Sequence, residues 1–283
     1  METVQELREE FVARSEADAL GIQPGGYLLE LSLDWIVLRA SENVHHLLSE
    51  SHVALIDEPL GRFVQAQALH DLRNLFSRLS GTTGIARAYG VRLTDERDRQ
   101  LHDITFQLSG GRVILEAVPS ASESFGQAFG SIGGLIVSMG ESRGEALLDG
   151  GARRMRALTG YDRVTLFLGD QQAESSRGTY PAPAARERDV PILVADSDAG
   201  SVAIFPRRSH DTSVAAALMK ADKLQTLRDA GVRSMMRVIF DGGEFRCDSR
   251  RPRQPNLEVH AAAELFAQLF AMRLEIDRLK KAD

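Results

Sequence analysis

The residues whose types and spacing could bind a metal ion are three histidines and a glutamate between Val44 and His52. His45 and His52 are seven positions apart, which places them on one face of a helix if that helix continues for two turns. His46 and Glu50 are four positions apart and could meet on another face. Neither pair brings a third ligand onto its own face, whereas a stable site needs three or four converging ligands. We therefore predict exposed helix histidines and no metal site.

No group of side chains indicates a catalytic centre. The sequence lacks a Gly-x-Ser-x-Gly motif and the histidine and aspartate companions that a serine nucleophile needs. Glycines between Gly126 and Gly134 follow no strand of a βαβ unit, so we interpret them as close helix packing or a kink rather than a dinucleotide loop. Kinase, cyclase and helix-turn-helix motifs are also missing. We predict that the protein is not an enzyme.

The single cysteine, Cys247, excludes a disulfide framework and any zinc site built from several cysteines. Basic residues form two short clusters, Arg207-Arg208 and Arg250-Arg251-Pro252-Arg253. These clusters could bind a phosphate or an acidic partner. Short basic runs are common on solvated loops, and we take that as the better interpretation.

The composition of the 283 residues is that of a globular chain with room for two domains. Its net charge of −6 argues against nucleic-acid binding, because counterion release needs a basic surface. No apolar run approaches the roughly 18 residues that cross a bilayer. Residues Met1 to Asp18 are acidic and lack the apolar core of a signal peptide. We predict a cytoplasmic protein that contacts neither nucleic acid nor membrane.

The first part of the chain mixes strand and helix patterns, as α+β domains do. Tyr27 to Ala40 predicts a hairpin with a turn near Ser32 to Asp34, and Trp35 is expected in the core. The other expected helices are Val4–Asp18, Ser41–Leu48 and Leu60–Leu79, and the other expected strands are Tyr89–Leu93, His102–Leu108 and Val113–Val118.

The second part begins with a largely helical stretch from Ala121 to Leu158 and ends with the clearest helix, Asn256 to Lys281. Lys220 to Ala230 is a further expected helix, and Gly169 to Ala185 has the composition of a linker. We expect one boundary, giving a first domain of residues 1–120 and a second of residues 121–283. The expected strands of the second domain are Val164–Leu168, Ile192–Asp196, Ser201–Phe205 and Met235–Phe240.

The last helix carries an apolar stripe whose members recur at steps of three and four residues. A surface helix with such a stripe would expose a large apolar patch unless another helix covered it. We expect this helix to join Glu145–Leu158 in a helical bundle that forms a dimer. The candidate interface residues are Leu265, Leu269, Met272, Ile276 and Leu279.

Four segments resemble bacterial phytochromes, and the resemblance spans about Leu20 to Leu279. Ile22-Gln23-Pro24-Gly25-Gly26 is similar to the Ile-Gln-Pro-His-Gly opening of the phytochrome PAS domain. Tyr161-Asp162-Arg163-Val164 resembles the start of the first GAF strand. Leu224–Arg233 is similar to the family's Leu-Arg-Asn-Met-Gly-Val segment, and Ala263–Gln268 resembles the helix that closes the GAF domain. The resemblance implies an α+β fold with a PAS-like domain, a GAF-like domain and long helices that form a parallel dimer.

The residues that hold the bilin in phytochromes depart from the family's pattern. Bacterial phytochromes attach biliverdin through a cysteine upstream of the PAS motif, and no cysteine precedes Cys247. The family's Pro-Ala-Ser-Asp-Ile-Pro motif is shortened after Tyr180, which removes its aspartate. The positions of the family's two pocket histidines and two propionate-binding arginines correspond to Lys223, Asp248, Ala217 and Ile192.

These departures matter because a biliverdin carries two propionates. An unpaired buried carboxylate costs on the order of several kcal/mol, so both propionates need cationic partners. Loss of the arginines leaves no guanidinium for them, and Asp248 would add repulsion. Lys223 is the residue expected to meet an anionic ligand. The candidate pocket residues are Phe167, Tyr180, Ile192, His210, Lys220, Lys223, Met235 and Asp248.

The resemblance and its departures predict a regulatory or signalling protein that does not bind bilin in the usual covalent way. It is expected to be a homodimer without a cofactor, to lack the PHY domain and an output module, and to act through a phytochrome, a kinase or a bilin-related enzyme. The alternative is a sensor, or photoreceptor, that binds biliverdin, haem or another small ligand without a covalent bond. Haem would need an axial ligand, for which His210 is the candidate.

In phytochromes the chain before the PAS domain also threads through a GAF loop to form a knot. The corresponding loop is Ser201 to Val214, and the N-terminal lead is shorter than usual. We expect the knot to be loosened or lost.

Overall fold

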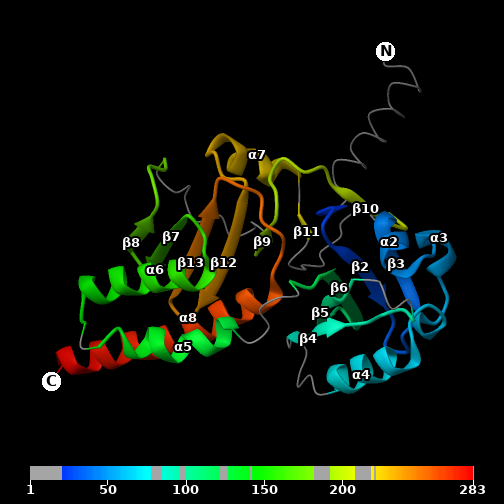
Figure 1. Cartoon of the computed structure of the whole chain (residues 1–283), viewed down its shortest axis with the longest axis horizontal. Helices are drawn as coiled ribbons and strands as arrows, with labels where there is room; N and C mark the ends of the chain where they lie inside the picture. Colours follow the sequence, from blue (N-terminus) through cyan, green and yellow to red (C-terminus); the bar gives the residue numbers. More distant parts are fainter. Residues whose placement is uncertain are drawn as a thin grey trace, which may run out of the picture. The chain divides into compact units, whose positions relative to one another are not determined.

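A computed structural model divides the chain into two compact units (Figure 1). The first unit contains Met1–Pro119 and Ala199–Ala221, and the second contains Ser120–Asp198 and Asp222–Asp283. The segment Ala199–Ala221 therefore joins the first unit, whereas the sequence suggested a single boundary after residue 120. The residues that the structure describes are 21–77, 85–95, 100–121, 127–140, 142–181, 192–207, 218–219 and 221–282. The helix expected over Val4–Asp18 lies outside them.

An antiparallel sheet of eight strands forms the first unit, in the order β11-β1-β10-β3-β2-β6-β5-β4. The hairpin and the three strands that the sequence predicted are confirmed to within a few residues. The strands are β1 (Gly21–Ile22), β2 (Tyr27–Leu31), β3 (Val37–Ser41), β4 (Ile85–Val91), β5 (His102–Ser109), β6 (Arg112–Pro119), β10 (Val202–Phe205) and β11 (Leu218–Met219).

Strand β10 corrects the prediction that Ser201–Phe205 belongs to the second domain. It pairs with β1 and β3, and β11 pairs with the other edge of β1, so β1 is flanked on both sides by the late segment Ala199–Ala221. Arg39 holds this segment, because its Nε donates to the carbonyl of Pro206 at 3.0 Å while its Nη1 contacts Glu30. The expected loss of the knot concerns residues before Gly21, which lie outside the described part.

Short helices pack against the core of the first sheet. The prediction that Trp35 lies in the core is confirmed, since its side chain is 5% exposed and packs edge to face against Phe76 and Phe106. The helix expected over Leu60–Leu79 is interrupted between residues 62 and 66. The helical elements are η1 (Glu42–Val44), α2 (His45–Leu48), α3 (His52–Leu55), η2 (Leu60–Arg62) and α4 (Ala66–Ser77).

The second unit contains a sheet of five strands in the order β8-β7-β13-β12-β9. The linker prediction for Gly169–Ala185 was wrong in its first half, which forms strand β8 and pairs with β7. Strand β13 was missed, because its charged residues hide the apolar alternation of a strand. The strands are β7 (Arg163–Leu168), β8 (Gln171–Ser176), β9 (Leu193–Val194), β12 (Ser234–Phe240) and β13 (Gly243–Ser249).

Helices cover one face of this second sheet (Figure 1). Helix α6 (Glu145–Thr159) and helix α8 (Leu257–Ala282) pack on the strands, and α5 (Gln127–Val137) packs on α8. The predicted association of the two long helical segments is therefore confirmed within the unit. The helices approach closely at Gly151, where a Cβ would lie 2.5 Å from the ring of Phe270. Helix α7 (Ala221–Asp229) precedes β12.

Candidate ligand-binding face of the second sheet

The central strands of the second sheet have two chemically different faces. Along β13, Phe245 and Cys247 alternate with Glu244, Arg246 and Asp248. The side chain of Phe245 packs on two phenylalanines of α8, so this set faces the helices. The charged set faces the opposite side, yet each of its members is at most 8% exposed. The part of the second face that β13 contributes is therefore polar and buried.

The register of three neighbouring strands arranges this face as three rows, which we call the polar grid. Each row takes one residue from β7, one from β13 and one from β12, and Arg246 occupies the centre. The rows are Phe167, Glu244 and Ile239; Thr165, Arg246 and Arg237; and Arg163, Asp248 and Met235. The grid thus holds three guanidinium groups and two carboxylates.

Asp248 bridges two of the arginines. Its Oδ2 accepts hydrogen bonds from Arg163 Nε at 3.0 Å and Nη2 at 2.6 Å, and its Oδ1 accepts one from Arg246 Nε at 3.0 Å. Arg163 and Asp248 are almost completely buried, so the carboxylate is desolvated and matched by guanidinium groups in place of water. The sequence suggested that Asp248 would repel a ligand's acid groups, but its charge is compensated within the protein.

A second ion pair links the central row to the row nearest the β12–β13 turn. Arg237 Nε donates to Glu244 Oε1 at 2.7 Å, and Arg237 Nη2 donates to Glu244 Oε2 at 2.8 Å. This fork uses both carboxylate oxygens, the geometry in which an arginine–carboxylate pair is strongest. Both carboxylate oxygens of Glu244 therefore bind Arg237, and neither forms a hydrogen bond with Arg246.

Two polar atoms at the centre of the grid lack hydrogen-bond partners. Arg246 Nη2 and Thr165 Oγ1 are both buried and make no hydrogen bond. The residues are register partners on β13 and β7. Most buried polar groups in proteins are paired. Two unpaired donors on neighbouring strands therefore make this position a candidate binding site.

The β7 end of the grid is fixed by a stack of aromatic and guanidinium groups. The guanidinium carbons of Arg163 and Arg250 lie 4.6 Å and 4.5 Å from the ring centre of Tyr180. Burial would raise the pKa of Asp162, but hydrogen bonds from Ser249 Oγ, the Arg250 N–H and the Tyr180 hydroxyl outweigh it and hold that pKa below its ordinary value. These contacts hold Tyr180 against the sheet.

The single cysteine is unsuited to covalent attachment of a ligand. Cys247 is 0% exposed and lies on the helix-covered face, away from the polar grid. Burial raises the pKa of its thiol, so the reactive thiolate is suppressed. A ligand on the polar face would have the sheet itself between its atoms and this sulfur.

The structure brings together three of the predicted pocket residues and leaves the others apart. Phe167, Met235 and Asp248 belong to the polar grid. Tyr180 lies at its edge, and the carbonyl of Ile192 accepts a hydrogen bond from the Arg237 N–H at 2.8 Å. Lys223 lies on α7, but its side chain is not among those described. His210 and Lys220 lie outside the described residues.

Sequence reasoning missed most of the polar grid. Arg163 was noted only as part of a motif, and Thr165, Arg237, Glu244 and Arg246 were not named. The available signal was the alternation of Glu244, Arg246 and Asp248, which places three charges on one side of a strand. Because β13 was not recognised as a strand, that signal remained unused.

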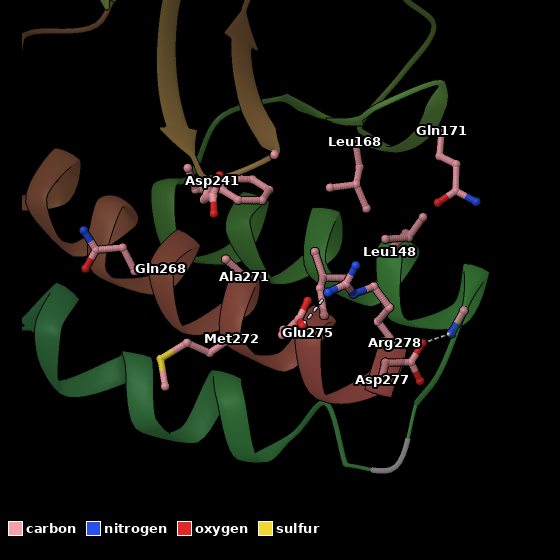
Figure 2. A pocket seen from close by; sticks show the side chains of 14 residues that line it. Leu148, Leu168, Gln171, Asp241, Gln268, Ala271, Met272, Glu275, Asp277 and Arg278 are labelled. Atoms are coloured by element: carbon pink, nitrogen blue, oxygen red, sulfur yellow. Dashed lines mark hydrogen bonds and ion pairs between the residues drawn. The ribbon is translucent and has the colours of Figure 1, made fainter. Parts of the chain in front are cut away.

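A separate hollow lies at the β12–β13 turn, beside α6 and α8 (Figure 2). Its volume is about 840 Å³, and its lining includes Leu148, Leu168, Phe240 and Met272. Figure 2 shows Glu275 and Arg278, an exposed ion pair of 2.8 Å, beside this hollow. Among the predicted site residues only Met272 lines it.

The apolar stripe of α8 is largely uncovered in the single chain. Its side chains are 40% exposed at Leu265, 64% at Met272, 46% at Ile276 and 56% at Leu279. Leu269 is half-buried. The buried side of the same helix contributes Phe266 and Phe270 to the core.

The histidines between Val44 and His52 do not form a continuous helix face. Ser49 adopts a left-handed conformation with φ +63°, so His45 and His52 lie in separate short helices. Over the residues described, no group of three or more potential metal ligands occurs. The described helices also include none with the length and apolarity needed to span a membrane.

Comparison with known proteins agrees with this geometry. Residues 17–119 match a family described as a PAS fold. The chromophore-binding domain of an unusual bacteriophytochrome from R. palustris superposes with a TM-score of 0.71 at 20% identity, covering 94% of this chain and 97% of that one. The chain has the fold of a bacteriophytochrome chromophore-binding domain. The fold class predicted from the sequence, PAS-like followed by GAF-like, is therefore confirmed.

Two further structures share the phytochrome-like fold. The chromophore-binding domain of a Stigmatella aurantiaca phytochrome has a TM-score of 0.67 at 21% identity, with coverage of 90% of this chain and 95% of that one. The photosensory core module from the same organism has a TM-score of 0.72 at 22% identity. The chain is covered to 91% in that match but spans only 58% of the module. A comparison with curated protein sequences gives no match.

Proposed function

We propose that this chain is a non-catalytic regulatory module with a phytochrome-like fold, which holds no covalent bilin and acts by binding other proteins. The observation that carries the proposal is the buried network of Arg163, Asp248 and Arg246, which occupies the polar face of the second sheet with protein side chains. Displacing these groups for a pigment would separate buried charges that now neutralise one another.

The poor fit of the grid residues to a bilin supports the same proposal. Two propionates need two cationic partners, since a buried carboxylate without one is costly. In the polar grid Arg237 is committed to Glu244, and Arg163 to Asp248. Only Arg246 retains a free guanidinium nitrogen within the grid. Among the grid residues that the structure describes, one free donor group cannot serve two propionates, and Cys247 lies on the wrong face for a thioether bond.

The apolar stripe of α8 supplies the surface for protein contacts. Leu269 and Ile276 take the a positions of a heptad repeat, and Leu265, Met272 and Leu279 take the d positions, which is the pattern of a coiled-coil seam. A second copy of the chain covers this seam in our proposal, as a homodimer. A further partner, such as a phytochrome, a kinase or a bilin-related enzyme, then receives the signal.

The test of this function is the absorption spectrum after incubation with biliverdin. The purified chain should stay without red absorption. The S. aurantiaca chromophore-binding domain, treated in the same way, is the comparison sample. A red-absorbing product that survives gel filtration would refute the proposal. Resistance of that product to denaturation would further identify a covalent bond.

A second candidate function, a non-covalent sensor of biliverdin, haem or another small ligand, is favoured by the unpaired donors Arg246 Nη2 and Thr165 Oγ1. A ligand that binds only the folded state raises the melting temperature. A thermal-shift comparison with haem, biliverdin and nucleotides therefore separates this candidate from the first. A haem signal that disappears in the variant His210→Ala would identify an axial ligand.

A further inference from the structure

The centre of the polar grid has a donor surplus that the rest of the grid cannot satisfy. Arg246 is 8% exposed and spends its Nε on Asp248, while its Nη2 has no partner. Thr165, its register partner, is 0% exposed, and its hydroxyl is also without a partner. Both atoms can donate hydrogen bonds, and both lie on the same face of adjacent strands.

The charges of the grid leave one positive charge over. Arg163 and Arg246 share the single carboxylate of Asp248, while Arg237 takes both oxygens of Glu244. Three buried guanidinium groups therefore face two buried carboxylates. One more acid, Glu174, lies opposite Thr165 on β8, but it is exposed and forms no ion pair with Arg246 in the part of the chain described.

We propose that the grid centre binds the carboxylate of a small monoanionic ligand, with Arg246 Nη2 and Thr165 Oγ1 as its donors. A single negative charge neutralises the surplus, whereas a dianionic phosphate exceeds it. Guanidinium and hydroxyl groups form charge-assisted hydrogen bonds with carboxylate oxygens. The proposal deepens the second candidate function above, on whose unpaired donors it rests, and does not depend on a protein partner.

The adjoining row indicates what the rest of the ligand is. Phe167 is half-buried and Ile239 is 60% exposed, and both flank Glu244 next to the central row. The grid is thus apolar and open to solvent on this side, while its centre is polar and shielded. A ligand that enters from here carries an apolar or aromatic body behind its acid group.

Benzoate is a suitable probe, and the neutral amide benzamide is its matched control. The full chain should show a saturable rise in melting temperature of at least about 2 °C with benzoate and none with benzamide. The rise should disappear in Arg246→Met and weaken in Thr165→Val, but persist in Thr165→Ser, which restores the hydroxyl. Arg251→Met, which alters an exposed arginine outside the grid, should respond like the natural chain.

Any one of three results overturns the inference. The natural chain does not respond to benzoate, it responds equally to benzamide, or Thr165→Val and Arg246→Met respond to benzoate as strongly as the natural chain does. If Arg246→Met fails to fold, the comparison of Thr165→Val with Thr165→Ser still decides. Inorganic phosphate forms a further arm, and stronger stabilisation by phosphate than by benzoate refutes the monoanion. A red complex with biliverdin would refute the proposed function. It would leave the present inference unaffected, because that inference is tested by the difference between the responses to benzoate and benzamide.

Discussion

Replacing Asp248 by asparagine tests whether the buried ion network stabilises the second unit. The substitution keeps the size of the side chain but leaves Arg163 and Arg246 buried without a counter-charge. Removing one partner of a buried ion pair costs about 3–5 kcal/mol, because the remaining charge stays desolvated. For a unit of this size the loss corresponds to a fall in melting temperature of about 6–20 °C.

The assay must report on the second unit separately from the first. The only tryptophan, Trp35, lies in the core of the first unit, so its fluorescence follows that unit alone. Hydrogen exchange measured by mass spectrometry on peptides from β12 and β13 follows the second unit. We expect faster exchange there in Asp248→Asn, with an unchanged fluorescence transition at Trp35 if the units unfold independently.

The matched control is Asp196→Asn, which removes the carboxylate of a partly exposed pair with Arg233. Such pairs contribute about 0–1 kcal/mol, so its exchange pattern should stay close to that of the natural chain. If Asp248→Asn changes the stability of the second unit by no more than Asp196→Asn does, the reasoning about a desolvated network is wrong.

Three further predictions address the pKa of an acid, the thiol and the α8 stripe. Hydrogen bonds hold the folded-state pKa of Asp162 below its ordinary value, so the stabilisation by this carboxylate is present above about pH 4 and is lost as the pH falls through the folded pKa. Asp162→Asn should therefore have a lower melting temperature than the natural chain at pH 7, and this difference should shrink in acid. A difference in melting temperature that does not depend on pH contradicts the prediction. Cys247 should resist iodoacetamide at pH 8 until the chain is unfolded, as read by intact mass, since burial raises its pKa. Ile276→Asp should halve the mass measured by light scattering, while Val53→Asp, at an exposed residue of the first unit, should not; equal masses for both variants would exclude the α8 seam.

The sequence was informative where local patterns and family motifs were strong. The hairpin around Trp35 and the helix from Asn256 were predictable from period and turn chemistry, and the structure confirms them. Asn256 also caps that helix, because its Oδ1 accepts the Val259 N–H at 2.9 Å. The order of the two domains came from short motifs, which the superpositions support at the level of fold.

Long-range pairing was beyond reach of local patterns. The run Ser201–Phe205 reads as a strand, but nothing in its residues says that it pairs with β1 and β3 of the first sheet. The site was missed for a related reason. Asp248 was named from a motif, yet its partner Arg163 is 85 positions away in the sequence, and only the β7–β13 register brings the two together.

The fold alone does not assign a function, because one scaffold can carry unrelated sites. What the structure adds is a route by which either a bound anion or a bound protein could act on the other. Arg246 and Phe245 are neighbours on β13 and face opposite sides of the sheet. Phe245 lies against Phe266 and Phe270 on the buried side of α8. The exposed side of that helix carries Met272 and Ile276.

Packing is thus continuous from the grid centre, through one strand, to the proposed dimer seam. Tightly packed interiors transmit displacement because they have few voids to absorb it. Linkage then requires reciprocity: if benzoate at Arg246 shifts the dimerisation constant, dimerisation must shift the affinity for benzoate by the same factor. Benzoate titrations of the natural chain and of Ile276→Asp therefore measure the same coupling from its two ends, and equal affinities in the two would mean that the ligand face and the seam act independently.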